Sequence, residues 1–394
     1  MSGTGAGLEG TGLEGSVSVR LTAAAGRVRA VSVQVRRPAA ARALCGRTPD
    51  EAMRLVPLLF SLCGTAQSLA AVGALEDALG LDARPHAAAR ALLADAEAAT
   101  NHAWQILMDW PARLGEAPQP RELAGLRAAA AAIHPALYPA RDGLRPGGGS
   151  LQPDRAALAA AVAALRDGLE RAVFAAPPPA DAVELERWTV VGATPAARLM
   201  RLLLAPGMAG FGACGVPALE PHPARWFGER LAVDAAFSET PRQDGAPAHT
   251  GPLARQGAHP LVAALLSAHG SGLAAHAAAR LAELAELAGR LASRADRLED
   301  AEPVQGPCGG LPGAGSGAAE TARGRLAHWL RLENGRVADC RIVAPTEWNF
   351  AADGPLAQGL AGAASDAGLA ERAGLLVAAL DPCVASSITI QDED

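Results

Sequence analysis

The stretch Asp381-Pro382-Cys383-Val384-Ala385-Ser386 lies almost at the end of the chain, shortly after the apolar residues 374–378. Proline fixes its own φ and biases the preceding residue away from helix, so Asp381 and Cys383 should be held in a defined relation. Thiolates bind metals, and neighbouring groups set their orientation, so a carboxylate beside a thiol fits the corner of a metal site. A buried, unreactive cysteine is the alternative. The stretch alone leaves both interpretations open.

Composition excludes several classes of protein. The chain has 394 residues, 50% of them hydrophobic, which is enough for one large domain or two ordinary ones. No apolar run reaches the ~20 residues that cross a bilayer, and residues 1–16 contain no signal sequence. The net charge of −6 does not suggest a nucleic-acid or anionic-membrane partner. The 6 cysteines form no Cys-x-x-Cys pair, so neither a disulfide framework nor a zinc ribbon is expected. These features predict a cytoplasmic protein without a membrane span.

Hydrophobic periodicity predicts an α+β protein that is mainly α, with small antiparallel β-hairpins around a helical core. Apolar and polar residues alternate over residues 16–37, and Asn334-Gly335 separates two apolar segments, so each stretch predicts a hairpin. Thr48 followed by Pro49 is expected to cap a helix that runs towards Cys63. Further helical patterns occur after Gly64 up to Gly80 and over residues 87–110, 155–174 and 260–298.

The chain is expected to have a flexible N-terminus, residues 1–15, and one domain, residues 16–394. Gly/Pro-rich breaks are expected near residues 139–153 and 302–318. Residues 193–253 are rich in Pro and Gly and are expected to be mostly loop. A loop region of that length is usually functional or wraps a partner.

Five separated stretches carry a family resemblance. They are Gly-Arg-Thr-Pro-Asp-Glu-Ala at 46–52 with Cys63 and Ser-Leu-Ala-Ala at 68–71, Pro-Arg-Gln-Asp-Gly at 241–245 with Gly-Pro-Leu-Ala-Arg at 251–255, Glu-Thr-Ala-Arg-Gly at 320–324 with His328-Trp329, Pro-Thr-Glu-Trp-Asn at 345–349, and Asp-Pro-Cys at 381–383. In this order they resemble the large, catalytic subunit of nickel–iron hydrogenases, over most of the chain from about residue 16. The resemblance implies that family's helical core and a site at which the two ends of the chain meet.

The cysteines depart from that family's pattern. The family has a Cys-x-x-Cys pair near each end of the chain, and the four thiolates hold nickel and iron together. Here the first pair corresponds to Phe60 and Cys63, and the second to Cys383 and Ser386. Cys63-Gly64 can also be read as the family's first Cys-Gly, so two registers stay open. Two thiolates cannot hold nickel as four do, and no nickel is expected.

Other functional positions of the family are also replaced. The histidine that follows the first pair corresponds to Gln67, and the one that follows the last cysteine corresponds to Thr389. The glutamate that passes protons falls near Ala41, and the family's Asp-His pair corresponds to Asn101-His102. The resemblance therefore argues against an enzyme that splits hydrogen.

The groups that would surround an iron with cyanide and carbonyl ligands look retained. The resemblance implies that Cys63 and Cys383 bind the iron, that Arg323 donates to a cyanide nitrogen, that Thr346 offers a hydroxyl, and that Asp381 orients Arg323. The pattern is similar to an offshoot of the family, the HupK-type (or HoxV-type) hydrogenase expression/formation proteins. That similarity implies a non-catalytic scaffold that carries the iron dicyano-carbonyl unit before its delivery to the hydrogenase large subunit. The implied partners are the hydrogenase large subunit precursor and hydrogenase maturation chaperones.

Structural interpretations compete with these roles. Arg323 can form a partly buried structural ion pair, and aromatic and histidine side chains are more often core residues than site residues. The side chains expected in the core are Trp104, Trp329, Trp348, His102 and His328. The cysteines without a counterpart in the family are Cys45, Cys214, Cys308 and Cys340. Alternative functions are a divergent catalytic large subunit and a site-less mimic that recruits maturation chaperones.

Overall fold

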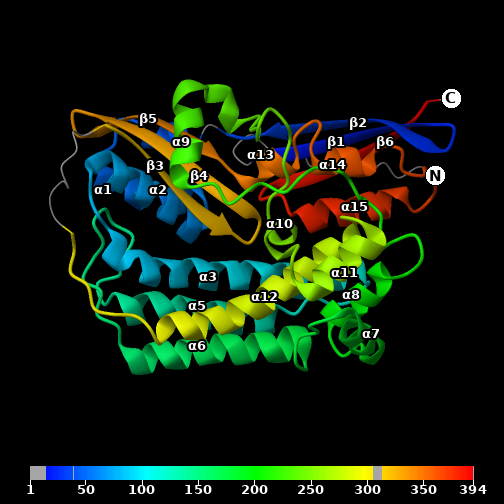
Figure 1. The fold of residues 1–394 in the computed structure, drawn as a ribbon, viewed down its shortest axis with the longest axis horizontal. Coiled ribbons are helices and arrows are strands. Elements are labelled where there is room, and N and C mark those ends of the chain that lie inside the picture. The colour runs from blue at the N-terminus through cyan, green and yellow to red at the C-terminus, as the bar shows by residue number, and fades with distance from the viewer. Residues whose placement is uncertain (1–14, 39, 305–312, 394) are drawn as a thin grey trace, which may run out of the picture.

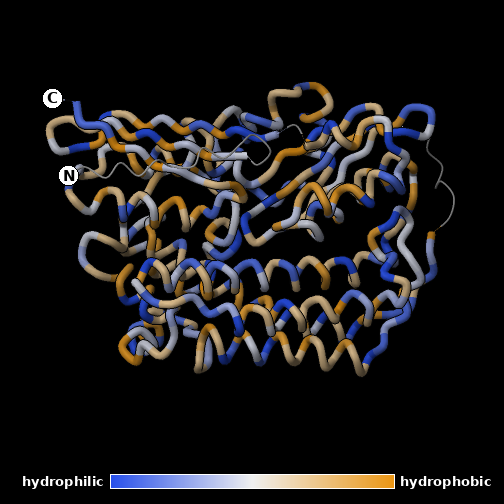
Figure 2. The backbone as a smooth tube through the Cα atoms, turned by 180° about the vertical axis from the view of Figure 1, so that it is seen from behind, coloured by the Kyte–Doolittle hydropathy of each residue, from blue (hydrophilic) through white to orange (hydrophobic). Residues whose placement is uncertain are grey.

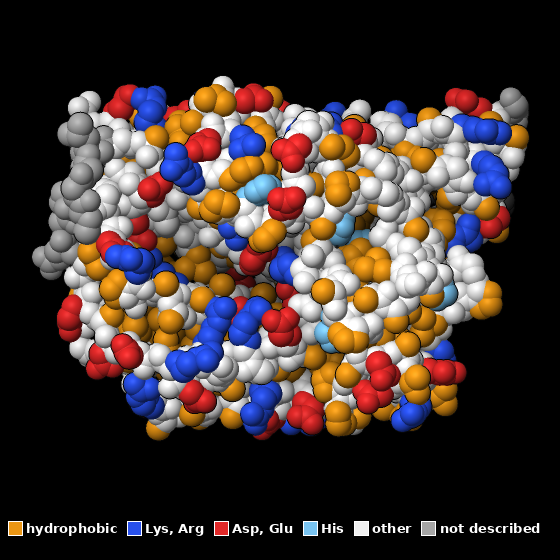
Figure 3. All heavy atoms as spheres, in the orientation of Figure 1, with side chains coloured by type: hydrophobic (Ala, Val, Ile, Leu, Met, Phe, Trp, Pro, Cys, Tyr) orange, Lys and Arg blue, Asp and Glu red, His pale blue; other side chains and the backbone are white. Residues whose placement is uncertain are grey.

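The computed structural model describes residues 15–38, 40–304 and 313–393. Except for Gly15, the predicted flexible N-terminus lies outside the described residues, and so does Cys308. Figure 1 shows two layers, with two small sheets and their helices above and a layer of long helices below. Figure 3 shows that this face is hollowed between the layers, with arginine side chains along the hollow. The predicted fold class, α+β and mainly helical, is confirmed.

The N-terminal hairpin forms as predicted but gains a third strand. β1 (Ser16–Ala24) and β2 (Arg27–Arg36) pair antiparallel, and β6 (Ala385–Asp392) joins β1 in parallel, in the order β2-β1-β6. The predicted antiparallel hairpin is therefore present, and the parallel strand β6 is an addition that the sequence did not predict. Because β6 begins two residues after Cys383, pairing with β1 holds that cysteine in place.

The second sheet is antiparallel, with the order β3-β4-β5. Its strands are β3 (Ala314–Thr321), β4 (Gly324–Glu333) and β5 (Arg336–Val343). Asn334 and Gly335 both have positive φ, 51° and 71°, as a tight hairpin turn requires. The hairpin predicted there is confirmed.

The prediction of a linker up to residue 318 is wrong for residues 314–318, which belong to β3. The Gly- and Ala-rich sequence has weak strand propensity, and packing accounts for the strand. A side chain at Gly315 would collide with the backbone of α2 (Gly64–Leu79) at Ala74, and one at Gly317 would collide with it at Ala70. The small residues therefore let β3 lie directly against the helix.

The helices that flank Cys63 begin and end where the sequence predicts. α1 (Pro49–Leu59) has a capping box, in which the Glu51 amide donates to Thr48 Oγ1 and the Thr48 amide donates to the Glu51 carboxylate. α2 starts directly after Cys63 and ends at Gly80, whose φ of 67° is the left-handed conformation typical of a helix end. Local signals therefore fix the outer ends of the two helices, and Cys63 lies in the short turn between them, as the N-cap residue of α2 without a side-chain capping hydrogen bond.

The lower layer consists of long amphipathic helices, visible as alternating hydrophobic and hydrophilic stretches in Figure 2. Its longest members are α3 (Ala87–Trp104), α5 (Pro120–Leu137), α6 (Arg155–Leu169) and α12 (Leu273–Ala295). The predicted break at residues 139–153 separates α5 from α6. Short π-helical segments, Gln105–Asp109 and Glu170–Phe174, follow α3 and α6 and lie within the helical ranges 87–110 and 155–174 that the sequence predicts. The remaining α-helices of the described residues are α4 (Trp110–Arg113), α7 (Ala182–Val191), α8 (Pro195–Leu203), α9 (Ala224–Val233), α10 (Pro252–Gln256), α11 (Pro260–His269), α13 (Pro345–Asn349), α14 (Pro355–Leu360) and α15 (Leu369–Leu380).

Residues 193–253 are mostly loop, as predicted, although they also contain α8 and α9. α8 has a local start signal, since Thr194 Oγ1 accepts from the Ala197 amide and Pro195 occupies the first turn. The pattern over residues 260–298 is two helices, because Gly270 ends α11 with a φ of 69°. Among the helices of the described residues, none has the length and apolarity needed to span a membrane.

Candidate functional site

The structure brings the stretches around Cys63 and Cys383 together. Cys63 precedes the first turn of α2, and Cys383 lies between α15 and β6. The two thiols lie close enough for the charge of Cys383 to act on Cys63. The candidate site therefore combines two ends of the chain, as the family resemblance implied.

Cys63 is buried, and its environment disfavours its thiolate. Burial, followed by the charges of Cys383 and Glu97, raises the pKa of the Cys63 thiol to about 12, while Arg323 acts in the opposite direction. Gln67 Nε2 lies 3.8 Å from Cys63 Sγ. Gln67 Oε1 lies 2.6 Å from His328 Nε2, which acts as the donor of that hydrogen bond. The side chain that replaces the family's histidine thus links the thiol to a buried histidine.

Residues of α3 fix the turn that carries Cys63. The Glu97 carboxylate accepts from the amides of Thr65 and Ala66, at 2.6 and 2.9 Å, at the start of α2. Asn101 Nδ2 donates to the Leu62 carbonyl oxygen at 3.1 Å. Burial raises the pKa of Glu97. Sequence reasoning missed Glu97, although its spacing from Asn101 places both residues on one face of α3.

Three polar side chains meet at Cys383. Thr346 Oγ1 lies 3.5 Å from Cys383 Sγ, and Arg37 Nη2 donates to the same sulfur at 2.8 Å. Arg37 Nε also lies 2.5 Å from a carboxylate oxygen of Glu347. Thr346 was a candidate from the sequence, whereas Arg37 and Glu347 were not. Arg37 follows β2, and its sequence neighbours contain no motif that marks it.

Arg323 and Asp381 form the ion pair that the resemblance implied. Arg323 Nε lies 3.3 Å from Asp381 Oδ1, and both side chains are buried. Asp381 ends α15 in the left-handed conformation, with a φ of 53°. Burial lowers the pKa of Arg323, but Asp381, Cys383 and Cys63 outweigh it, so the pKa is raised. Arg323 Nη1 is buried and has no hydrogen-bond partner among the described residues.

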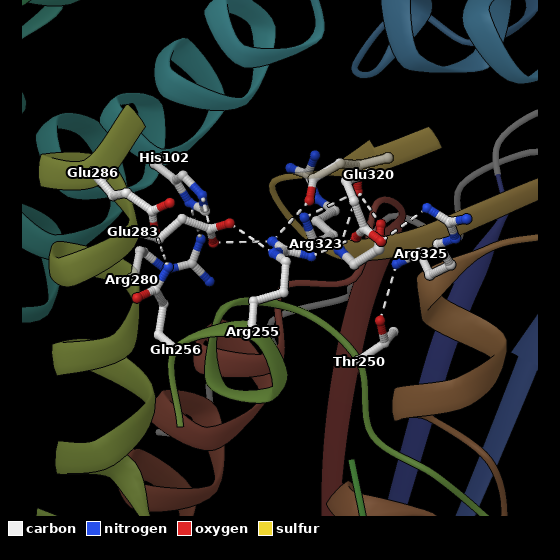
Figure 4. A network of polar contacts seen from close by, with 12 residues as sticks. His102, Thr250, Arg255, Gln256, Arg280, Glu283, Glu286, Glu320, Arg323 and Arg325 are labelled. Carbon is white, nitrogen blue, oxygen red and sulfur yellow. Dashed lines mark hydrogen bonds and ion pairs between the residues drawn. The ribbon is translucent and has the colours of Figure 1, made fainter. Parts of the chain in front are cut away.

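A polar network continues from Asp381 into the helical layer; Figure 4 shows its members Arg280, His102, Glu283 and Arg255. Arg280 Nη1 lies 3.5 Å from Asp381 and 3.1 Å from His102 Nδ1. His102 Nε2 lies 3.3 Å from Glu283, and Arg255 binds that carboxylate at 2.6 and 2.9 Å. Arg280 is a further residue that sequence reasoning missed. His102 is a core histidine with polar partners, as expected. Through Arg280, the network contacts Asp381 on the side of the helical layer.

A cleft of about 680 Å³ lies beside the Cys63 turn. Pro57 of α1 and Gly64 and Thr65 of α2 form one side, and Arg141 and Arg145, from the connection after α5, line it as well. Within the described ranges, no three His, Cys, Asp or Glu side chains are grouped so as to hold a metal ion. The candidate site therefore offers two thiols and an open approach near one of them.

Phe60 and Ser386 stand where the family has its other two cysteines. Phe60 follows the last turn of α1 and packs against an apolar cluster that includes Leu44 and Val56. Ser386 is exposed in β6, opposite Val17 of β1. Each residue is therefore held by secondary structure or packing of its own.

His328 should make the fold sensitive to acid. It is fully buried, and burial lowers its pKa from 6.5 to about 3. The unfolded chain therefore takes up this proton at a higher pH than the folded chain, so the stability from neutral His328 is present above about pH 6.5 and is lost as the pH falls towards 3. At about 1.4 kcal/mol per pKa unit, the loss should reach a few kcal/mol. Urea unfolding at pH 7 and pH 4.5 should show a smaller acid effect in His328→Gln, and an equal effect would contradict this role.

Comparisons with known proteins add independent information. Residues 302–388 match the family described as nickel-dependent hydrogenase. The hydrogenase expression/formation protein HupK of Azotobacter vinelandii is 33% identical over 389 residues, which cover 96% of this chain and 99% of that protein. HoxV of Cupriavidus necator, another hydrogenase expression/formation protein, is 33% identical over 389 residues and 93% of this chain. HupK of Rhizobium leguminosarum bv. viciae is 30% identical over 96% of this chain.

Solved structures resemble this fold over nearly its whole length. The Ni-Fe-Se hydrogenase of D. vulgaris Hildenborough superposes with a TM-score of 0.64 at 19% identity, covering 91% of this chain and 94% of that chain. The Ni-Fe-Se hydrogenase of Desulfomicrobium baculatum gives a TM-score of 0.64 at 16% identity. At these identities the likeness shows a shared fold and nothing about chemistry.

Proposed function

The chain belongs to the hydrogenase expression/formation (maturation) proteins of the HupK and HoxV type, within the nickel-dependent hydrogenase large-subunit family, and on this premise we propose that it carries an iron dicyano-carbonyl unit before transfer to the hydrogenase large subunit. In this role the iron unit is cargo. The protein is a scaffold, does not split hydrogen and needs no nickel.

The observation that carries the proposal is an unpartnered nitrogen of the Arg323 guanidinium. Its Nη1 is buried and meets no acceptor within the described residues, while its charge interacts with both Cys63 and Cys383. A buried donor without an acceptor is unfavourable by about 1–3 kcal/mol. A cyanide nitrogen on an iron held between the two sulfurs would supply that acceptor.

The two thiols would bind the iron, and the surrounding groups would orient its ligands. Cys63 and Cys383 supply two sulfur ligands, which suffices for an iron that brings cyanide and carbonyl with it. Because the pKa of Cys63 is raised to about 12, the iron must displace the proton of this thiol on loading. Asp381 holds Arg323, and the Thr346 hydroxyl lies beside Cys383. At neutral pH a proton competes with the iron for the Cys63 sulfur. Such competition favours release of the iron, so the site suits transfer better than permanent storage.

Anaerobic purification from cells that make a hydrogenase, followed by metal analysis and infrared spectroscopy, tests the proposal. Iron with cyanide and carbonyl bands, and without nickel, supports the carrier. Nickel with hydrogen turnover would instead support a divergent catalytic subunit. Neither metal nor bands would support a site-less mimic that recruits chaperones.

The recipient should approach through apolar side chains around the Cys63 turn. Leu58, Leu59 and Leu62 are 77%, 36% and 48% exposed. Trp104 is 38% exposed, so the expectation that it lies in the core is wrong. Trp104 lies one helical turn from Asn101, whose side chain binds the Leu62 carbonyl, so all four residues surround one turn. Exposed apolar clusters often mark protein interfaces. We assign this apolar rim, Leu58, Leu59, Leu62 and Trp104, to the hydrogenase large subunit precursor.

Leu62→Glu should weaken the complex with that precursor by at least about tenfold, because a carboxylate would be buried without a partner on binding. Val191→Glu is the matched control, since Val191 is 76% exposed at the end of α7, away from α1 in Figure 1. Pull-down of the precursor with each variant measures the effect. If both variants lose binding of the precursor equally, or if neither loses it, the assignment is contradicted.

The proposed location is the cytoplasm, where a precursor is matured. The described cysteines are all free thiols, as is usual in a reducing compartment; they are Cys45, Cys63, Cys214, Cys340 and Cys383.

A further inference from the structure

A second arginine–carboxylate pair lies at the site, on the Cys383 side. Arg37 Nη2 donates to Cys383 Sγ at 2.8 Å, while Arg37 Nε lies 2.5 Å from Glu347. Glu347 belongs to the first turn of α13, directly after Thr346, whose hydroxyl also reaches Cys383. The sulfur of Cys383 is thus contacted from both the end of β2 and the start of α13.

The position of Glu347 is fixed by its own helix. The Ala344 amide donates to Glu347 Oε2 at 3.1 Å, and the side chain of Glu347 is only 6% exposed. Arg37 Nε and the Glu347 carboxylate form an ion pair by distance, without hydrogen-bond geometry. Because the guanidinium is a rigid planar group, holding its Nε side beside Glu347 limits where Nη2 can point. Glu347 therefore aims Arg37 at the sulfur of Cys383.

Within the described part of the chain, Cys63 has no comparable partner. The contact to its sulfur there is a long one from the Gln67 amide, at 3.8 Å, whereas Cys383 receives a charged donor at 2.8 Å. A neutral iron dicyano-carbonyl unit bound by two thiolates leaves negative charge in a poorly solvated site. A guanidinium in contact with one sulfur would both offset that charge and draw electron density away from the sulfur.

We propose that Arg37, aimed by Glu347, is a positioning residue that sets how firmly Cys383 holds the iron unit. The proposal rests on the iron-carrier function and adds Arg37, which lies outside the family stretches, together with Glu347, which lies in the stretch 345–349 but had no role assigned from the sequence. Arg37 supports retention through its charge, and it weakens sulfur donation to iron through its hydrogen bond.

Arg37→Gln should lower iron retention during anaerobic dialysis by about 10-fold or more, the usual effect of losing a group that supports a metal ligand. Its carbonyl band should move to lower wavenumber, because a sulfur without the charged hydrogen bond donates more density to iron and onward to carbonyl. Glu347→Gln keeps an acceptor for the Ala344 amide and leaves Arg37 charged. It should therefore retain iron as well as or better than the parent, with the carbonyl band moved to higher wavenumber.

Arg36→Gln is the matched control, because Arg36 is the exposed neighbour of Arg37 at the end of β2. It should leave retention and band position unchanged. Equal iron loss and equal loss of thermal stability in the Arg37 and Glu347 variants would overturn the proposal, because a structural ion pair predicts that result. Unchanged bands and retention in Arg37→Gln would also overturn it. A parent protein without the bands would instead refute the iron-carrier function itself.

Discussion

Cys63→Ala and Cys383→Ala should each abolish iron retention while leaving the fold nearly intact. Each replacement removes one of the only two sulfur ligands proposed for the iron, and one thiolate cannot chelate it. Burial makes Cys63 a small apolar residue in packing terms, and alanine is close to it in size. Cys383 is partly exposed, so its loss should disturb the core even less.

Cys340→Ala provides the matched control. Cys340 is buried like Cys63, and burial raises the pKa of its thiol to about 12 as well. It belongs to a separate apolar cluster with Leu330 and Val337. Metal analysis should show iron in Cys340→Ala and none in the other two, with similar thermal unfolding midpoints for all three. Iron retained in Cys63→Ala, or a midpoint far below the parent's, would favour a structural role for Cys63.

Arg323→Gln should lower iron retention by about 10- to 100-fold. The replacement removes a buried positive charge beside both thiols and the unpartnered Nη1 donor. Asp381 keeps Arg280 as a partner at 3.5 Å, so the fold should persist. Arg323→Lys retains the charge without the planar fork and should give an intermediate loss.

Arg325→Gln is the control for Arg323, because Arg325 binds Glu320 and the His222 carbonyl instead of the thiol pair. Iron content and the cyanide bands should match the parent in this variant, whereas the cyanide bands should shift in Arg323→Lys. Parent-like iron content in Arg323→Gln would mean that Arg323 only forms a structural ion pair with Asp381.

Local sequence signals determined the parts of the fold that were predicted well. The Thr48 cap, the Gly80 helix end and the Asn334-Gly335 turn each depend on a few adjacent residues, and all three appear as expected. The strands β3 and β6 were not predicted from the sequence, because they form through contacts with elements that are distant in the chain. β3 depends on glycines that fit against α2, and β6 depends on pairing with β1 across almost the whole chain.

The same distinction applies to the site. Cys63, Cys383, Arg323, Thr346 and Asp381 were candidates because they stand in stretches that resemble one family, and the structure gathers them. Arg37, Glu97 and Arg280 stand in the same site without a motif of their own. Glu347 stands in the stretch 345–349, but the sequence assigned it no role. Only the folded chain shows that the end of β2 reaches the sulfur of Cys383.

The most direct test of iron carriage is a transfer experiment. The protein, purified anaerobically with its iron, is mixed with iron-free hydrogenase large subunit precursor and separated again. We expect iron and the cyanide and carbonyl bands to leave this protein and appear on the precursor, with none transferred from Cys63→Ala preparations. Bands that stay on this protein while the precursor acquires its iron from another source would contradict the carrier function.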